Sequence, residues 1–105
     1  MRRLLALCTL LVVGLAVASA QTATPRVTKR QVKQETRIEQ GVKSGELTAG
    51  ETRRLERQQK KIAVDKSKAK ADGVVTPAER AKLTHEQNRA SRRIYRMKHN
   101  DKTAK

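Results

Sequence analysis

Apolar residues recur every three or four positions along three stretches of the chain. The last stretch shows the pattern most fully, with Leu83, Ala90, Ile94 and Met97 on one side of a helix and Gln87 filling the remaining position. The two earlier stretches have the same spacing with fewer aliphatic side chains: Leu55, Ile62 and Ala69 in one, and Val27, Gln31, Gln34, Ile38 and Val42 in the other. These stripes predict three amphipathic, coiled-coil-like helices in which glutamine and alanine stand where leucine would pack more strongly.

A repeated segment predicts where these helices begin. Residues 45–51 (Gly-Glu-Leu-Thr-Ala-Gly-Glu) recur at an offset of 28 as residues 73–79 (Gly-Val-Val-Thr-Pro-Ala-Glu). In each copy a Thr precedes a Glu by three positions. This is the spacing of a capping box, in which hydroxyl and carboxylate each accept a hydrogen bond from a backbone N–H of the first turn. The predicted cap residues are Thr48 with Glu51, Thr76 with Glu79 and with Pro77 at the first helical position, and a weaker upstream copy, Thr28 with Gln31.

Two glycines predict where helices end. Gly45 and Gly73 follow periodic stretches at the position where a left-handed residue commonly terminates a helix. We therefore expect an all-α fold of two or three antiparallel helices at about 28–43, 48–71 and 76–99, joined by short glycine-containing turns. They would form one helical domain, 28–99, preceded by a flexible segment, 21–27, and followed by a flexible tail, 100–105.

The first twenty residues have the pattern of a cleavable secretory signal peptide. Two arginines follow Met1, residues 4–17 carry no charge, and Ala18-Ser19-Ala20 is a small-x-small cleavage site before Gln21. The apolar run is shorter than the roughly 20 residues that a membrane-spanning helix needs. We therefore predict cleavage between Ala20 and Gln21 and a periplasmic or secreted mature protein without cysteine.

Composition limits the stability that we expect of this domain. Without Arg2 and Arg3, the 25 Lys and Arg fall to 23 against 10 Asp and Glu, so the mature net charge is +13. Only twelve mature residues are Leu, Ile or Val, and none is Phe. A chain so poor in aliphatic residues and so highly charged is near the composition of disordered proteins. We expect a marginal core, and the alternative is three solvated helices without stable tertiary packing.

The sequence contains no evident catalytic set, and we predict a protein that is not an enzyme and needs no cofactor. His85 and His99 lie fourteen positions apart without the further ligands that a metal site requires. Residues 72–79 resemble the second half of an EF-hand loop, from Asp72 at the turn to Glu79 at the last ligand position. Lys68 and Lys70 occupy the leading ligand positions and would repel Ca²⁺, so we predict no metal site and keep a degenerate divalent-ion module as an alternative.

Two family resemblances bear on location and fold. Leu83-Thr84-His85-Glu86-Gln87 resembles the Leu-Thr-x-x-Gln motif of the Spy/CpxP periplasmic chaperones. The repeated units, Ser-Gly-x-Leu-Thr-x-x-Glu at 44–51 and Ala-Asp-Gly-x-x-Thr-x-x-Glu at 71–79, resemble those of a family of small exported proteins of Gram-negative bacteria. The second resemblance implies an envelope location and a helical fold but no particular activity. A chaperone or stress accessory role is the alternative that the first implies.

Positive charge is concentrated in the last predicted helix. Five cations fall within ten residues: Arg89, Arg92, Arg93, Arg96 and Lys98. Tyr95 is the only aromatic residue of the chain, so single-stranded nucleic acid would find no stacking platform. Our leading hypothesis is therefore a non-enzymatic protein that binds an anionic envelope partner, such as lipid phosphate, lipopolysaccharide or an acidic protein. The alternative is that these cations form a solvated helix end that suits the helix dipole.

Overall fold

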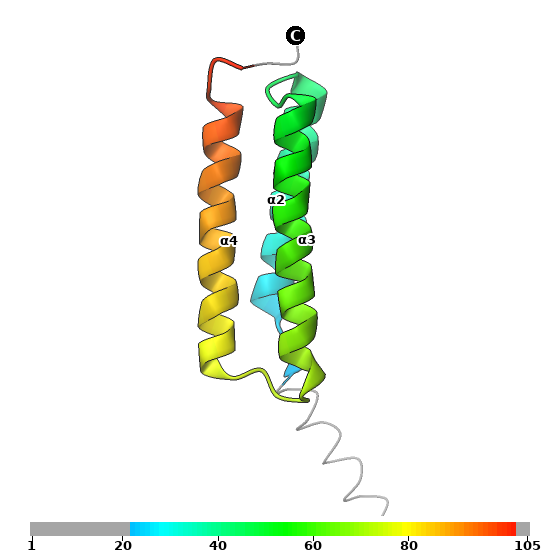
Figure 1. Cartoon of the computed structure of the whole chain (residues 1–105), viewed down its shortest axis with the longest axis vertical. Coiled ribbons are helices and arrows are strands. Elements are labelled where there is room, and N and C mark those ends of the chain that lie inside the picture. The colour runs from blue at the N-terminus through cyan, green and yellow to red at the C-terminus, as the bar shows by residue number, and fades with distance from the viewer. Residues whose placement is uncertain (1–21, 103–105) are drawn as a thin grey trace, which may run out of the picture.

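Three long helices account for nearly all of residues 22–102, the part of the chain that the computed structural model describes. They are α2 (Pro25–Ser44), α3 (Ala49–Ala71) and α4 (Pro77–Lys98), and the predicted all-α class is confirmed. The helices lie side by side, and each runs in the opposite direction to the one before it (Figure 1). All three pairs of helices contact one another, so the fold is a three-helix bundle.

Capping boxes begin both α3 and α4. The Oγ1 atom of Thr48 accepts from the backbone N–H of Glu51 at 3.1 Å, and a carboxylate oxygen of Glu51 accepts from the N–H of Thr48 at 3.0 Å. Thr76 and Glu79 form the same reciprocal pair at 3.1 Å in both directions. Pro77 follows at the first turn of α4, where a missing N–H leaves no helical bond unmade. These local contacts start the two helices within one residue of the predicted positions.

The start of α2 differs from the prediction. The helix begins at Pro25, with Thr24 as the N-cap residue, and the N–H of Thr28 donates to the carbonyl of Thr24 at 3.0 Å. Thr28 is therefore inside the helix and is not a cap, and residues 25–27 are helical and not loose. Thr28 and Gln31 instead accept hydrogen bonds from the Lys66 ammonium at 3.0 and 2.8 Å, because residues three positions apart share one helix face.

Glycines occupy the turns at both ends of α3. Gly45, with φ 78°, ends α2 in the left-handed conformation, and Gly73, with φ 81°, follows the C-cap of α3. Gly41 has a different role. The N–H of Leu47 donates to its carbonyl at 3.1 Å, and a Cβ at position 41 would lie 2.6 Å from the Leu47 side chain. The returning chain therefore packs directly on the backbone of α2 at this point.

Most of the buried apolar residues form two clusters with a polar layer between them, and Ile62 and Ala90 are buried as well. One cluster lies where α2 begins, and the other lies near the α2–α3 turn. The first contains Val27, Ala69, Val75 and Leu83, and the second contains Ile38, Leu47, Leu55 and Ile94 with Met97 packed against it. Each helix passes from one cluster to the other through a buried glutamine.

The three glutamines form a hydrogen-bonded layer across the bundle. Gln59 donates to the side-chain oxygen of Gln34, Gln34 donates to the backbone carbonyl of Gln87, and Gln87 donates to the carbonyl of Val27, each at 2.8 Å. The side chains come from α3, α2 and α4 in turn. This chain of bonds connects all three helices at one level, and it offsets much of the cost of burying the amides.

The C-terminal segment is also held to the bundle. Asn100 donates to the second carboxylate oxygen of Glu51 at 2.6 Å, so the predicted loose tail is anchored at this residue. Burial opposes ionisation of Glu51, but the hydrogen bonds from Thr48 and Asn100 together lower its pKa. The predicted signal peptide, with its cleavage site between Ala20 and Gln21, and the end of the tail lie outside the described residues. Within 22–102, no helix has the length and apolar character needed to cross a membrane.

Candidate functional site

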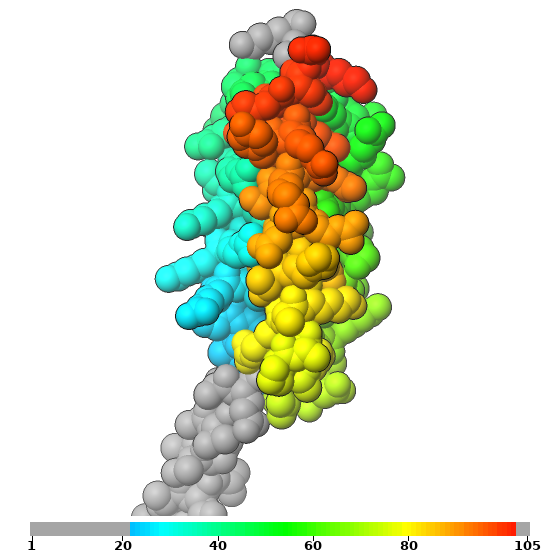
Figure 2. Space-filling view, turned by 90° about the vertical axis from the view of Figure 1, so that its left-hand side faces the viewer, coloured from blue at the N-terminus to red at the C-terminus, as the bar shows by residue number. Residues whose placement is uncertain are grey.

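Helix α4 presents a broad exposed surface with two flanks. In Figure 2 it faces the viewer, with α2 along one side and α3 along the other. Leu83, Ala90 and Ile94 face the core, so the cations of α4 occupy the remaining positions of the helix. The structure therefore divides the predicted basic residues between two separate surfaces, one on each flank.

The flank beside α2 contains the exposed aromatic residue. We call it the Tyr95 face, and it surrounds a shallow hollow of about 460 Å³ lined by Arg37, Ser91, Arg92, Tyr95 and Arg96. Tyr95 is 58% exposed and stacks on the ring of His99, with ring centroids 4.0 Å apart and an interplanar angle of 22°.

Three arginines lie around this aromatic pair, one held by hydrogen bonds and two unpaired. Arg37 is held in place because it donates to the hydroxyl of Ser91 at 2.8 Å and to its carbonyl at 3.2 Å. Arg92 and Arg96 are exposed, and their guanidinium groups have no ion pair or hydrogen bond with any residue from 22 to 102. The Tyr95 face thus combines an exposed aromatic ring with unpaired guanidinium groups.

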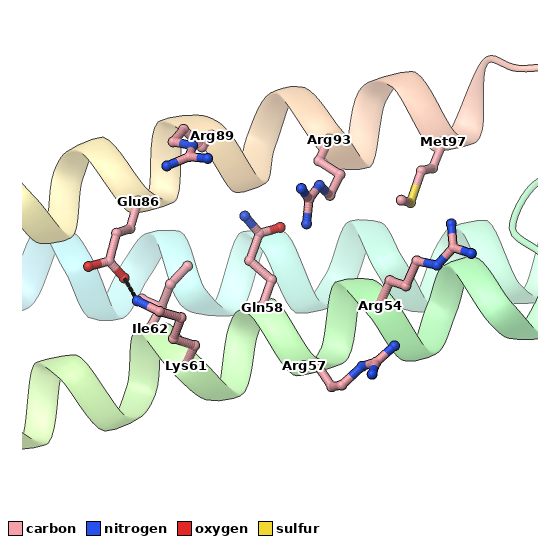
Figure 3. Close-up of a pocket in the computed structure, with 9 residues that line it drawn as sticks. All are labelled: Arg54, Arg57, Gln58, Lys61, Ile62, Glu86, Arg89, Arg93 and Met97. Atoms are coloured by element: carbon pink, nitrogen blue, oxygen red, sulfur yellow. Dashed lines mark ion pairs between the residues drawn. The ribbon is translucent and has the colours of Figure 1, made fainter.

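The flank beside α3 forms a basic groove. We call it the α3/α4 groove; its volume is about 560 Å³, and it is lined by Arg54, Arg57, Gln58, Lys61 and Ile62 from α3 and by Glu86, Arg89, Arg93 and Met97 from α4. Figure 3 shows Arg93 extending from α4 toward α3 and Arg54 extending from α3 toward α4. Five of the nine lining residues are cations, and only one is an acid.

The acid closes one end of the α3/α4 groove. Lys61 lies 2.8 Å from Asp65 and 3.7 Å from Glu86, and Lys82 lies 4.0 Å from Glu86. Partial burial, followed by the neighbouring Asp65 carboxyl, raises the pKa of Glu86. The hydrogen bond to Asp65 and the Glu86 charge raise the pKa of Lys61. This end is close to electrically neutral, and the unpaired positive charge lies toward Arg93 and Met97.

The predicted basic residues therefore do not form one patch. Arg89 and Arg93 lie in the α3/α4 groove, whereas Arg92 and Arg96 lie on the Tyr95 face. Lys98 lies near Gly41 of α2, at the end of the bundle. The sequence analysis missed Arg54 and Arg57 on α3. Their spacing of three positions was a usable signal, because it places both on one side of that helix.

The other sequence motifs have structural roles here. Leu83 and Gln87 of the Leu-Thr-x-x-Gln motif are buried in the core. In the EF-hand-like segment, Glu79 is engaged in the capping box of α4. No group of three or more His, Cys, Asp or Glu side chains within 22–102 is arranged to hold a metal ion.

Comparison of the chain with protein-family models, with curated proteins and with solved structures finds no match in any of the three. The case for function therefore depends on the sequence pattern and on the two basic surfaces.

Proposed function

We propose that this is a non-enzymatic, exported protein whose Tyr95 face docks on an anionic surface of the cell envelope. One observation carries the proposal: Tyr95, in a chain without Phe or Trp, is exposed and lines one hollow with the unpaired guanidinium groups of Arg92 and Arg96. The signal-like pattern of residues 1–20 supports the envelope as the place of action.

The chemistry of this face suits a membrane–water boundary. A tyrosine ring has an apolar body and a polar hydroxyl, and such side chains favour the headgroup level of a bilayer. Each arginine near an anionic leaflet contributes on the order of 1 kcal/mol to binding. A net positive charge also attracts the protein toward such a surface before contact is made.

Vesicle binding tests the proposal directly. Tyrosine fluorescence reports on the Tyr95 face alone, because the chain has one Tyr and no Trp. We expect the emission to change on addition of phosphatidylglycerol vesicles and to stay constant with neutral phosphatidylcholine vesicles. Binding should weaken between about 10 mM and about 150 mM salt, as the Debye length falls from about 30 Å to about 8 Å.

Two double variants of α4 separate a specific face from net charge. Arg92→Glu/Arg96→Glu reverses two charges on the Tyr95 face, and Arg89→Glu/Arg93→Glu reverses two in the α3/α4 groove with the same spacing on the same helix. We expect the first variant to lose vesicle binding and the second to retain most of it. Equal loss in both would contradict docking through the Tyr95 face, and so would a wild-type protein that ignores anionic vesicles at low salt.

A further inference from the structure

Four arginines line the α3/α4 groove without an acidic partner. Arg54 and Arg57 come from α3, and Arg89 and Arg93 come from α4. None of the four guanidinium groups has an ion pair or hydrogen bond within residues 22–102. Like charges gathered in one concavity repel each other, so an anion placed among them gains more than it would beside one exposed arginine. We propose that the α3/α4 groove is a binding site for a small soluble anion that contains two or more phosphate groups.

The side-chain type favours phosphate. Guanidinium groups donate paired, parallel hydrogen bonds that match the oxygens of phosphate, and such charge-assisted bonds are stronger than neutral ones. Apart from Lys61, which is engaged with Asp65 and Glu86, every cation of the groove is an arginine. The donors available to a ligand are therefore all of the kind that binds phosphate in a bidentate manner.

Spacing along the helices favours more than one phosphate. Arg89 and Arg93 are four residues apart, which is a rise of about 6 Å along α4, and Arg54 and Arg57 are separated by about 4.5 Å along α3. A short chain of phosphates can therefore meet more of these groups at once, from both helices, than a single phosphate can. The affinity should consequently increase with the number of linked phosphates.

The volume of the groove and the distribution of charge along it indicate where the anion would bind. The groove volume of about 560 Å³ is within the usual range for small-molecule sites. Glu86 is paired with Lys61 at one end, so this end offers an anion no unpaired charge, and binding is favoured toward Arg54 and Arg93 (Figure 3). Because Arg54 and Arg93 extend into the space between the two helices, a small soluble anion can reach both, whereas a flat bilayer would meet the rim of the groove (Figure 3).

Titration calorimetry with tripolyphosphate and orthophosphate tests the site. At one fixed salt concentration, we expect saturable binding of tripolyphosphate that is at least about tenfold tighter than that of orthophosphate, as several charge-assisted bonds replace one. The melting temperature should also rise with tripolyphosphate concentration, because the ligand binds the folded state. Equal affinity for the two anions would overturn the proposal.

The two α4 double variants locate the site. Arg89→Glu/Arg93→Glu should lose tripolyphosphate binding by about tenfold or more, whereas Arg92→Glu/Arg96→Glu should retain it within about threefold. Equal loss in both would mean that only net charge matters and would overturn the proposal. Arg54→Gln/Arg57→Gln removes two exposed groove side chains of α3 and should weaken binding too. This third variant keeps the test decisive if the α4 variant folds poorly.

The vesicle experiment distinguishes this site from the Tyr95 face. If Arg89→Glu/Arg93→Glu abolishes binding to phosphate-bearing vesicles and leaves tripolyphosphate binding intact, the groove serves lipid headgroups and the proposal of a soluble ligand is wrong. If wild type ignores vesicles yet binds tripolyphosphate through the groove, membrane docking fails and the groove proposal stands. The two outcomes are therefore independent.

Discussion

Two carboxyl groups on neighbouring helices interact in this bundle. Glu35 of α2 meets Glu56 of α3, and partial burial, followed by this contact, raises the pKa of Glu35 to about 7. Between pH about 4.5 and pH about 7 the folded state keeps a proton that the unfolded state has released. The contribution of this group to stability is therefore greatest at low pH and is lost as the pH rises through this window.

Replacement of Glu35 by Gln should remove this pH dependence. The amide keeps a hydrogen-bonding group but cannot ionise, so Glu35→Gln should melt at a higher temperature than wild type at pH 8 and at a similar temperature below pH 4.5. Circular dichroism melts across this range measure the difference. Glu39→Gln is the control, because it removes the same charge from α2 at an exposed residue paired with Lys43. Parallel pH profiles for wild type and Glu35→Gln would show that Glu35 does not titrate as described.

For the helices, the capping boxes predict how much stability is lost when a single cap hydroxyl is removed. Thr48→Ala and Thr76→Ala each remove a hydroxyl that accepts a backbone N–H, and each should lower the free energy of unfolding by about 0.5–2 kcal/mol. Thr28→Ala should change it by less than about 0.5 kcal/mol, because this exposed hydroxyl only accepts from Lys66. Urea unfolding followed by circular dichroism measures all three. A Thr28→Ala variant as destabilised as the other two would argue for a cap at Thr28.

The three threonines also show why the starts of α3 and α4 could be predicted closely and the start of α2 could not. The starts of α3 and α4 depend on contacts within four residues, which a sequence pattern contains in full. Thr28 and Gln31 have the same spacing, but Pro25 already provides a favourable first-turn residue upstream. Thr28 and Gln31 therefore lie on one face of a helix that has already begun, and both accept hydrogen bonds from Lys66. Spacing alone does not distinguish these two uses.

The two basic surfaces show what a sequence pattern cannot predict about the arrangement of the bundle. A helical wheel predicts that the cations of α4 avoid Ala90 and Ile94, and both residues are indeed buried. It does not predict which flank of α4 meets α2 and which meets α3, since this depends on how the chain returns after each turn. Arg89 and Arg92 are close in sequence and lie on different surfaces for that reason. Likewise, the contact of Leu47 with Gly41 depends on the path of the turn.

The glutamine layer is the feature that most distinguishes this bundle from a simple apolar coiled coil. Gln34 accepts from Gln59 and donates to the carbonyl of Gln87, so its loss leaves a buried amide of Gln59 without an acceptor. An unpaired buried polar group costs about 1–3 kcal/mol, whereas removal of all partners together can be neutral or stabilising. The three amides should therefore act as a unit.

Single and triple substitutions of the layer should accordingly have opposite effects. We expect Gln34→Leu to lower the free energy of unfolding by about 1–3 kcal/mol, because Gln59 loses its partner. Gln34→Leu/Gln59→Leu/Gln87→Leu should be at least as stable as wild type, since it joins the two apolar clusters into one and leaves no buried amide. Urea unfolding measures both, and Gln40→Leu, at an exposed position of α2, is the control for added hydrophobicity. If the triple variant were less stable than wild type, the amides would stabilise the bundle through their own hydrogen bonds. The polar layer would then not lower stability in exchange for holding the three helices in register.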